Sequence, residues 1–266
     1  MDQSLTQTQR IVVALDTSPQ SYAALETAAR LARLMGAELY GLFVEDSLLH
    51  QLGDFPFSAE VGAYSATPRA LTQLCIGRQF RAVENAAQQR MRRVAAQAHV
   101  AWRFEVIQGG VASELMNAAA NAAILSLGRA GWSKGKRLGS TAAQILAQVD
   151  RPILLSGKKS RWSNRITALF TGSPASARAL QQAAQLARQS KGKLTVETPS
   201  QELASAAAQQ LANLGVEAHL VVRVSNVDWS HELWQIKDGL LVMPKEMVSP
   251  LAALLDILDL PILLVP

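Results

Sequence analysis

The sequence has few of the features that would point to a secreted, membrane-spanning or disordered chain. It contains one cysteine, Cys75, so no disulfide can form within the chain, and we expect this thiol to pack in its apolar surroundings. Charged residues make up 18% and hydrophobic residues 49%, which excludes global disorder. Residues 1–10 lack the apolar core of a signal peptide, and the apolar tail 251–266 is interrupted by charge and proline. We therefore expect a cytoplasmic protein with no membrane partner.

The chain also lacks the residue clusters that common catalytic and metal sites require. His50, His99, His219 and His231 are scattered, with neither metal-ligand spacing nor a nucleophile partner. The carboxylates of "VED" (44–46) could hold a metal, but such acids more often solvate the end of a strand. The net charge of +5 is mild for 266 residues, and no aromatic platform adjoins the basic cluster. We therefore expect no nucleic-acid partner, no metal ligands from the protein and no catalytic residues.

Two stretches of the sequence repeat one another in the same order. Residues 11–39 align without a gap with residues 166–194, at an offset of 155. Each reads as a strand, a Ser-Pro pair and an Ala/Leu-rich helix, and two later strand-like runs repeat at offsets of 116 and 109. Such a repeat predicts tandem copies of one unit, joined here by the polar, basic stretch 157–165. We expect one domain over residues 1–157 and a second over residues 158–266.

Strand-like and helical patterns alternate within each half. Several strand-like runs are continuously apolar, as parallel strands covered on both faces are. Ser18 suits the N-cap of the helix after the first strand, with Pro19 in its first turn and Gly36 at its end. The pattern predicts an α/β doubly wound fold in each half. In the first half we expect strands near 11–15, 38–44, 101–108, 123–127 and 152–156, and a second long helix over 78–98.

A glycine-rich basic loop, "GRAGWSKGKRLGST" (128–141), follows an apolar strand and precedes a helix. It contains four glycines, four basic residues and no acid. Open α/β sheets bind ligands at the carboxyl ends of their strands, and free amides at a helix start favour phosphate. The spacing of the glycines and the residue after the lysine exclude a Walker A loop. A phosphate site and a solvated surface loop both remain open from this stretch alone.

Further stretches of the first half carry a resemblance to a known family. They are "VVALDTSP" (12–19), "LYGLFVED" (39–46), "VIQGGVASEL" (106–115), the loop 128–141, and "DRPILL" (150–155) near the end of the first half. Together they resemble the universal stress proteins, over nearly the whole chain as two tandem domains. The resemblance implies two doubly wound parallel five-stranded sheets of strand order 3-2-1-4-5, similar to adenine-nucleotide α-hydrolases and related by a pseudo-twofold axis.

The resemblance also implies a cofactor, ATP or a related adenine nucleotide, and Mg²⁺ bound together with that nucleotide. Asp16 and the backbone near Val44 would hold the adenine and ribose, and the glycine-rich loop would hold the phosphates. The family's nucleotide-binding members carry G-x2-G-x9-G-[ST], whereas this loop reads G-x2-G-x7-G-S, two residues shorter. If the intervening segment is helical, Gly139 and Ser140 miss the phosphate, whereas an extended segment still reaches it. The implied cofactor-binding residues are Ala14, Asp16, Val44, Gly128, Arg129, Gly131, Gly139, Ser140 and Thr141.

The second half lacks the residues of this site. At the repeat offsets, Asp16 aligns with Thr171 and Gly128 aligns with Pro244. The stretch after Pro244 is seven residues shorter than its counterpart and contains no glycine. We therefore expect the second half to bind no nucleotide by this mode and to pair with the first as the subunits of a family dimer do. Its last strand would then face the strand near 152–156.

Three functions follow from these observations. The first is a stress-associated regulator that binds ATP in the first domain, without efficient turnover, and changes its interaction with an unidentified protein partner. The second is an interaction or scaffold protein of the same fold that binds no nucleotide. The third, a slow ATPase, is the weakest because no general base, metal pair or arginine finger is in view. The sequence leaves open whether two chains form a homodimer. The long segment 46–74 is a lid, a surface for a partner, or a segment that packs on its own domain.

Overall fold

A computed structural model describes residues 9–47, 51, 59–61, 68–70, 73–130, 138–157, 162–223, 233, 235–236, 238–248, 258 and 260–266. In the first half (residues 1–157) the main strands are β1 (Arg10–Ala14), β2 (Glu38–Asp46), β5 (Trp102–Gly109), β6 (Ile124–Gly128) and β7 (Ile153–Ser156). In the second half (residues 158–266) they are β8 (Arg165–Leu169), β9 (Lys193–Thr198), β10 (His219–Val222), β11 (Leu240–Pro244) and β12 (Ile262–Val265).

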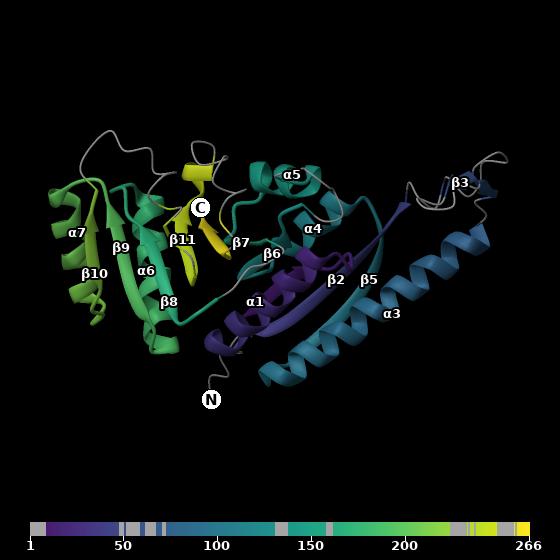
Figure 1. The fold of residues 1–266 in the computed structure, drawn as a ribbon, viewed down its shortest axis with the longest axis horizontal. Coiled ribbons are helices and arrows are strands. Elements are labelled where there is room, and N and C mark those ends of the chain that lie inside the picture. The colour runs from purple at the N-terminus through teal and green to yellow at the C-terminus, as the bar shows by residue number, and fades with distance from the viewer. Residues whose placement is uncertain are drawn as a thin grey trace, which may run out of the picture.

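These strands form one ten-stranded sheet in the order β10-β9-β8-β11-β12-β7-β6-β1-β2-β5 (Figure 1). Each half contributes five strands in the expected order 3-2-1-4-5, and the pairs within each half are parallel. The two halves meet where β7 pairs with β12 in antiparallel register, with Leu154 opposite Leu263. The predicted fold class, including the pairing of these two strands, is therefore confirmed.

Helices cover both faces of the sheet. On one face lie α1 (Pro19–Met35), α3 (Gln73–Ala98), α6 (Pro174–Ser190) and α7 (Gln201–Asn213), and on the other lie α4 (Val111–Ala119) and α5 (Ser140–Gln148). Successive side chains of β1 point to opposite faces: Ile11 and Val13 join the core under α1, and Val12 joins the core under α4 and α5. The central strands are therefore buried on both sides, as their unbroken apolar sequences predict.

The local signals that predict α1 have the expected structural effects. The Ser18 side chain accepts a hydrogen bond from the Ser21 amide, Pro19 lies in the first turn, and Gly36 ends the helix with a φ of 64°. The same pattern recurs at α6, where Ser173 caps the helix and accepts from the Ser176 amide. The bounds of β8 and α6 follow those of β1 and α1 at an offset of 155, and β11 and β12 follow β6 and β7 at offsets of 116 and 109.

Several sequence expectations concern residues that the structure describes only in part. Of segment 46–74, the structure describes a two-stranded antiparallel ladder of β3 (Ala59–Val61) and β4 (Pro68–Ala70), together with the start of α3. The Cys75 side chain, expected to pack in apolar surroundings, lies outside the described residues. α3 begins at Gln73, five residues before the predicted start at 78. None of the described helices is both long enough and apolar enough to cross a bilayer.

The pairing of the two halves yields a prediction for stability. Leu263 is fully buried opposite Leu154, so we expect Leu263→Ala to lower the free energy of unfolding by about 2–5 kcal/mol, measured by urea denaturation followed by circular dichroism. Leu74 is 60% exposed, and Leu74→Ala should change the same quantity by less than about 0.5 kcal/mol. Equal effects of the two substitutions would contradict the placement of Leu263 at the junction of the two halves.

Candidate functional site

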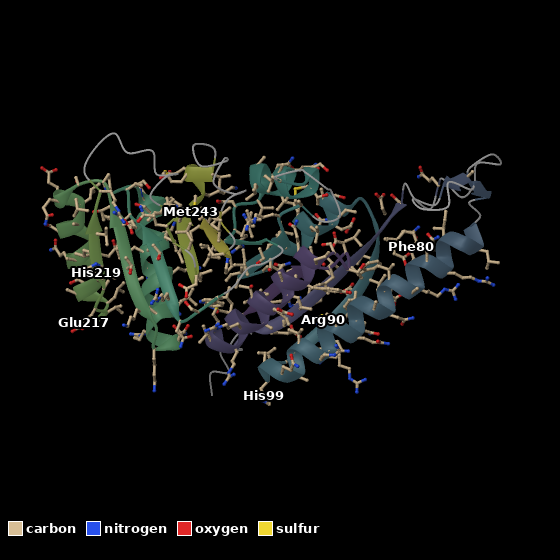
Figure 2. The ribbon with its side chains drawn as sticks, viewed as in Figure 1. Phe80, Arg90, His99, Glu217, His219 and Met243 are labelled. Atoms are coloured by element: carbon tan, nitrogen blue, oxygen red, sulfur yellow. The ribbon has the colours of Figure 1, made fainter. Side chains whose placement is uncertain are left out.

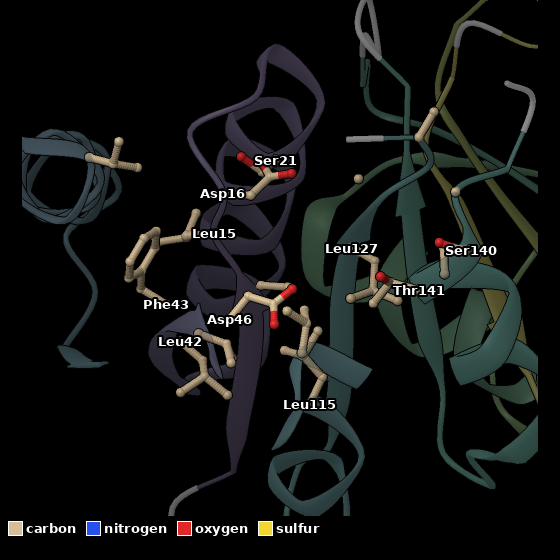
Figure 3. Close-up of a pocket in the computed structure, with 18 of the residues that line it drawn as sticks. Leu15, Asp16, Ser21, Leu42, Phe43, Asp46, Leu115, Leu127, Ser140 and Thr141 are labelled. Carbon is tan, nitrogen blue, oxygen red and sulfur yellow. The ribbon is translucent and has the colours of Figure 1, made fainter. Parts of the chain in front are cut away.

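A pocket of about 530 Å³ opens at the carboxyl ends of β1, β2 and β6 (Figure 3). Parallel α/β sheets bind ligands at this edge, at the point where the strand order reverses. Here the reversal lies between β1 and β6, which are neighbours although more than 100 residues separate them in sequence. The lining residues are Ala14, Leu15, Asp16, Ser21, Leu42, Phe43, Val44, Asp46, Ile76, Gln79, Phe80, Val83, Val111, Leu115, Leu127, Gly128, Arg129, Ala130, Gly139, Ser140, Thr141 and Ala142.

The pocket has an apolar wall and a polar end. Leu15, Leu42 and Phe43 come from β1 and β2, and Phe80 reaches the pocket from α3. Polar groups face the opening from different elements: Figure 3 shows Ser140 and Thr141, at the start of α5, across from Asp16 and Asp46. Such a pocket suits a ligand with a flat apolar part and a hydrophilic or anionic end.

The chain turns sharply where β1 ends. Thr17 has a φ of 59°, a conformation that β-branched residues rarely adopt, and the Ser18 amide donates to Asp16 Oδ1 at 2.9 Å. This turn keeps Asp16 exposed at the pocket rim, while Ser18 is buried and caps α1. Because strained backbone tends to occur at functional sites, Thr17 is a second signal, besides the carboxylate, that this turn is a binding element.

Gly128 is required for packing at the end of β6. A Cβ added there would lie 3.0 Å from the backbone carbon of Gln20 and from the amide nitrogen of Ser21. The first turn of α1 therefore packs directly against the Gly128 backbone. The next residue extends this contact, since the Ala130 amide donates to Gln20 Oε1 at 2.7 Å.

The glycine-rich loop is closed at its base by a backbone hydrogen bond. The Gly139 amide donates to the Arg129 carbonyl at 2.7 Å, so both ends of the loop meet beside the end of β6. Ser140 and Thr141 therefore line the pocket although the loop is two residues shorter than the family pattern. Ser140 thus lies at the pocket, and residues 131–137, whose conformation the two alternatives concern, lie outside the described residues. The Gly139 amide, predicted to face a phosphate, is engaged within the chain.

The start of α5 supplies the pocket's remaining backbone donors. The N-cap residue of α5 is Gly139, which has no side chain to cap the helix, and the first intrahelical bond at this end is from the Ala143 amide to the Gly139 carbonyl. The amides of Ser140, Thr141 and Ala142 therefore have no partner within the helix. Together with the positive end of the helix dipole, they form an arrangement that favours an anion.

Arg129 departs from the role expected of it. It lines the pocket, but its side chain is only 5% exposed and its guanidinium donates to the Leu258 carbonyl in the second half. The guanidinium also lies against Gly157, where an added Cβ would overlap it. Its charge is therefore held at the interface between the halves, rather than at the phosphate end where we expected it. Gly131, and the basic residues at 134, 136 and 137, lie outside the described residues.

In the second half the corresponding crevice is bridged by the protein's own side chains. Thr171 stands at the position of Asp16, and Pro244, the last residue of β11, stands at that of Gly128. A short 3₁₀ helix, η1 (Lys245–Val248), follows β11, and its Glu246 carboxylate accepts a hydrogen bond from the Ser173 hydroxyl at the start of α6. A carboxylate thus lies at the start of α6, the counterpart of α1, beside the crevice of this half.

Other candidate groups of the sequence do not join this site. Figure 2 shows His99 after α3 in the first half and His219 on β10 in the second, so these histidines are separate. His50 and His231 lie outside the described residues, which contain no group of three or more His, Cys, Asp or Glu side chains able to hold a metal. The sequence pattern does not identify Ser21 or the α3 residues of the pocket, and it indicates Asp46 as a solvated strand end or a metal ligand rather than as a pocket residue.

The two glycines allow a matched test of the packing argument. Gly128→Ala should lower the free energy of unfolding by about 1–3 kcal/mol, because the new methyl group overlaps the first turn of α1. Gly139→Ala should cost less, no more than about 1 kcal/mol from the loss of a favoured N-cap residue, because Gly139 has a φ of −66° and an added Cβ would meet its nearest atom at 3.5 Å. Thermal and urea unfolding of both variants measures this difference. A Gly128→Ala protein as stable as the wild type would exclude the close approach.

Comparisons with known proteins agree with this architecture. The family model described as "Universal stress protein family" matches residues 7–156. A comparison with curated proteins gives no match. A universal stress protein from Archaeoglobus fulgidus DSM 4304 is 16% identical with a TM-score of 0.70, covering 97% of this chain and 98% of that one. A functionally unknown protein from Pseudomonas aeruginosa PAO1 is 12% identical with a TM-score of 0.58, covering 97% and 92%. The structures show the fold, and because the family model spans more than half of the sequence, the chain belongs to the universal stress protein family.

Proposed function

We propose that the pocket of the first half binds ATP or a related adenine nucleotide, and that the protein is a nucleotide-dependent regulator without efficient turnover. One observation carries the proposal. Of the nine residues that the family resemblance implies, eight line this one pocket, although they come from four separate segments of the chain. The ninth, Gly131, lies outside the described residues. We further propose residues 1–157 as the nucleotide-binding domain and residues 158–266 as a degenerate copy.

The residues present fit such a ligand. The volume of about 530 Å³ lies within the range usual for small-molecule pockets. Leu42 and Leu115, which line the pocket on the same face of the sheet as α5, would take the adenine, and Asp16 at the rim would accept hydrogen bonds from the base or ribose. The phosphates would lie at the start of α5, where the amides of Ser140 and Thr141 and the helix dipole favour negative charge. Asp16 and Asp46 are the carboxylates that could hold a Mg²⁺ ion, which usually binds one or two carboxylates together with the nucleotide phosphates.

The same geometry favours binding over turnover. Phosphoryl transfer to water needs a positioned base and a cation that stabilises the charge developing on the phosphates. Arg129 is the only cation among the described lining residues, and its guanidinium donates to Leu258. The described residues therefore stabilise bound phosphate through backbone amides. This arrangement suits a regulator that changes its interaction with a protein partner according to nucleotide occupancy.

Titration with a fluorescent ATP analogue tests the proposal. We expect saturable binding to the wild type and at least about tenfold weaker binding to Asp16→Asn, since a hydrogen bond to a charged group contributes about 1.5–3 kcal/mol. The matched control is Asp238→Asn, which removes an exposed carboxylate of the second half that pairs with Arg165. The control should bind as the wild type does.

Each alternative function has its own outcome in this experiment. If the wild type shows no saturable binding at millimolar nucleotide, the regulator is excluded and the interaction or scaffold protein takes its place. If it releases phosphate from ATP over repeated turnovers, and Asp16→Asn abolishes that release, the slow ATPase takes its place. The regulator requires binding without such release.

A further inference from the structure

Two cations cross the interface between the halves at matching positions. Arg129 directly follows β6 and donates to the Leu258 carbonyl, and Lys245 directly follows β11 and donates through Nζ to the Val149 carbonyl at 2.6 Å. Arg129 and Lys245 are related by the same offset of 116 that relates β6 to β11. Val149 and Leu258 are related by the offset of 109 that relates β7 to β12. The two hydrogen bonds are therefore pseudo-symmetric counterparts, and each half holds the other.

The bond from Lys245 reaches the helix that faces the pocket. Val149 is the C-cap residue of α5, and a cation at a helix C-terminus interacts favourably with the dipole and with the last carbonyl groups. Burial lowers the pKa of the Lys245 ammonium group, and the nearby Asp150 carboxylate acts in the opposite direction. The second half thus places a partly buried amine on the end of α5 that points away from the pocket.

The bond from Arg129 acts at the other end of the same helix. The Arg129 amide donates to the Ser156 carbonyl at 3.0 Å, and the Arg129 carbonyl accepts from the Gly139 amide at 2.7 Å. The backbone of Arg129 therefore joins β7 to the N-cap of α5, while its side chain is anchored on Leu258. A displacement of the second half would be transmitted to the helix start that faces the pocket.

We propose that the second half is the positioning unit of the first half's nucleotide site, and that it acts through α5, which Lys245 and Arg129 hold at its two ends. This inference rests on the proposed nucleotide binding. It assigns a role in ligand affinity to a half that does not line the described pocket. Because coupling free energies are reciprocal, nucleotide binding must also stabilise the second half's contacts at this interface. Lys245 is a positioning residue, since it does not line the pocket.

Substitutions outside the pocket test the inference. Lys245→Met should weaken binding of the fluorescent ATP analogue about fivefold or more, in line with a cation lost from a partly buried helix C-terminus. Lys245→Arg, which keeps the charge and a donor, should bind within about twofold of the wild type. Lys193→Met is the matched control, because it removes an exposed cation on β9, away from the interface, and should leave affinity unchanged. Circular dichroism establishes that each variant folds.

A second substitution tests the contact made by the Arg129 side chain. Gly157→Ala adds a methyl group where the guanidinium lies, without altering a residue that lines the pocket, and should also weaken binding severalfold. The control is Gly77→Ala, where the nearest atom to an added Cβ is 3.9 Å away, and it should bind normally. If Lys245→Met does not fold, Gly157→Ala still decides the question.

Hydrogen exchange supplies a readout that a purely structural role would not affect. In the wild type, saturating ATP should slow amide exchange in peptides covering residues 240–248 and 260–266, and Lys245→Met should reduce this protection. If the wild type binds nucleotide but Lys245→Met and Gly157→Ala bind as tightly and no protection appears in the second half, the inference is overturned and the proposed function stands. If the wild type binds no nucleotide, both are overturned.

Discussion

The antiparallel pairing of β7 with β12 is the interaction on which the rest of the structure depends. Parallel units leave an open edge at their fifth strand, and here each half covers the open edge of the other. The side chains of both strands are fully or almost fully buried, so the pairing also joins the apolar cores of the two halves. It brings the end of β6 and the end of β11 close enough for the cations after each strand to reach the opposite half. The pocket is therefore built next to the interface rather than at a free surface.

The sequence predicts the fold well because its signals are local. The Ser-Pro pairs before α1 and α6 set the helix starts, and unbroken apolar runs identify strands that are covered on both faces. The strand order that the family resemblance implies then places Asp16 and Gly128 at one switch point, since topology brings together residues that the chain separates. Thr17 is the exception among the local signals, because a threonine with positive φ cannot be anticipated from its sequence.

The part of the site that escaped prediction depends on side-chain direction and on distant elements. The sequence identifies Arg129 as a positive charge in a glycine-rich loop, but the direction of its side chain is set by the second half through Leu258. Ile76 lines the pocket from the part of α3 that precedes the predicted start at 78, and Phe80 lines it from within the predicted helix. The role of Gly128 is likewise different in kind: the glycine pattern suggests access for a phosphate, whereas the structure requires close contact with Gln20. Such packing relations have no signature within a short stretch of sequence.

The two residues after β11 explain how one half can lose a binding site and still matter to the other. Glu246 accepts a hydrogen bond from Ser173 at the crevice of the second half, while Lys245 donates to the C-terminus of α5. The first half uses the matching positions differently, because Ala130 leaves its crevice open while Arg129 crosses the interface. The two halves therefore differ at the second position after the strand, which is Ala130 in one and Glu246 in the other, and both have a cation at the first. A half with no glycine loop can therefore still fix the geometry of its partner's site. Loss of a ligand site and retention of an interface are separable because they depend on adjacent residues whose side chains contact different elements.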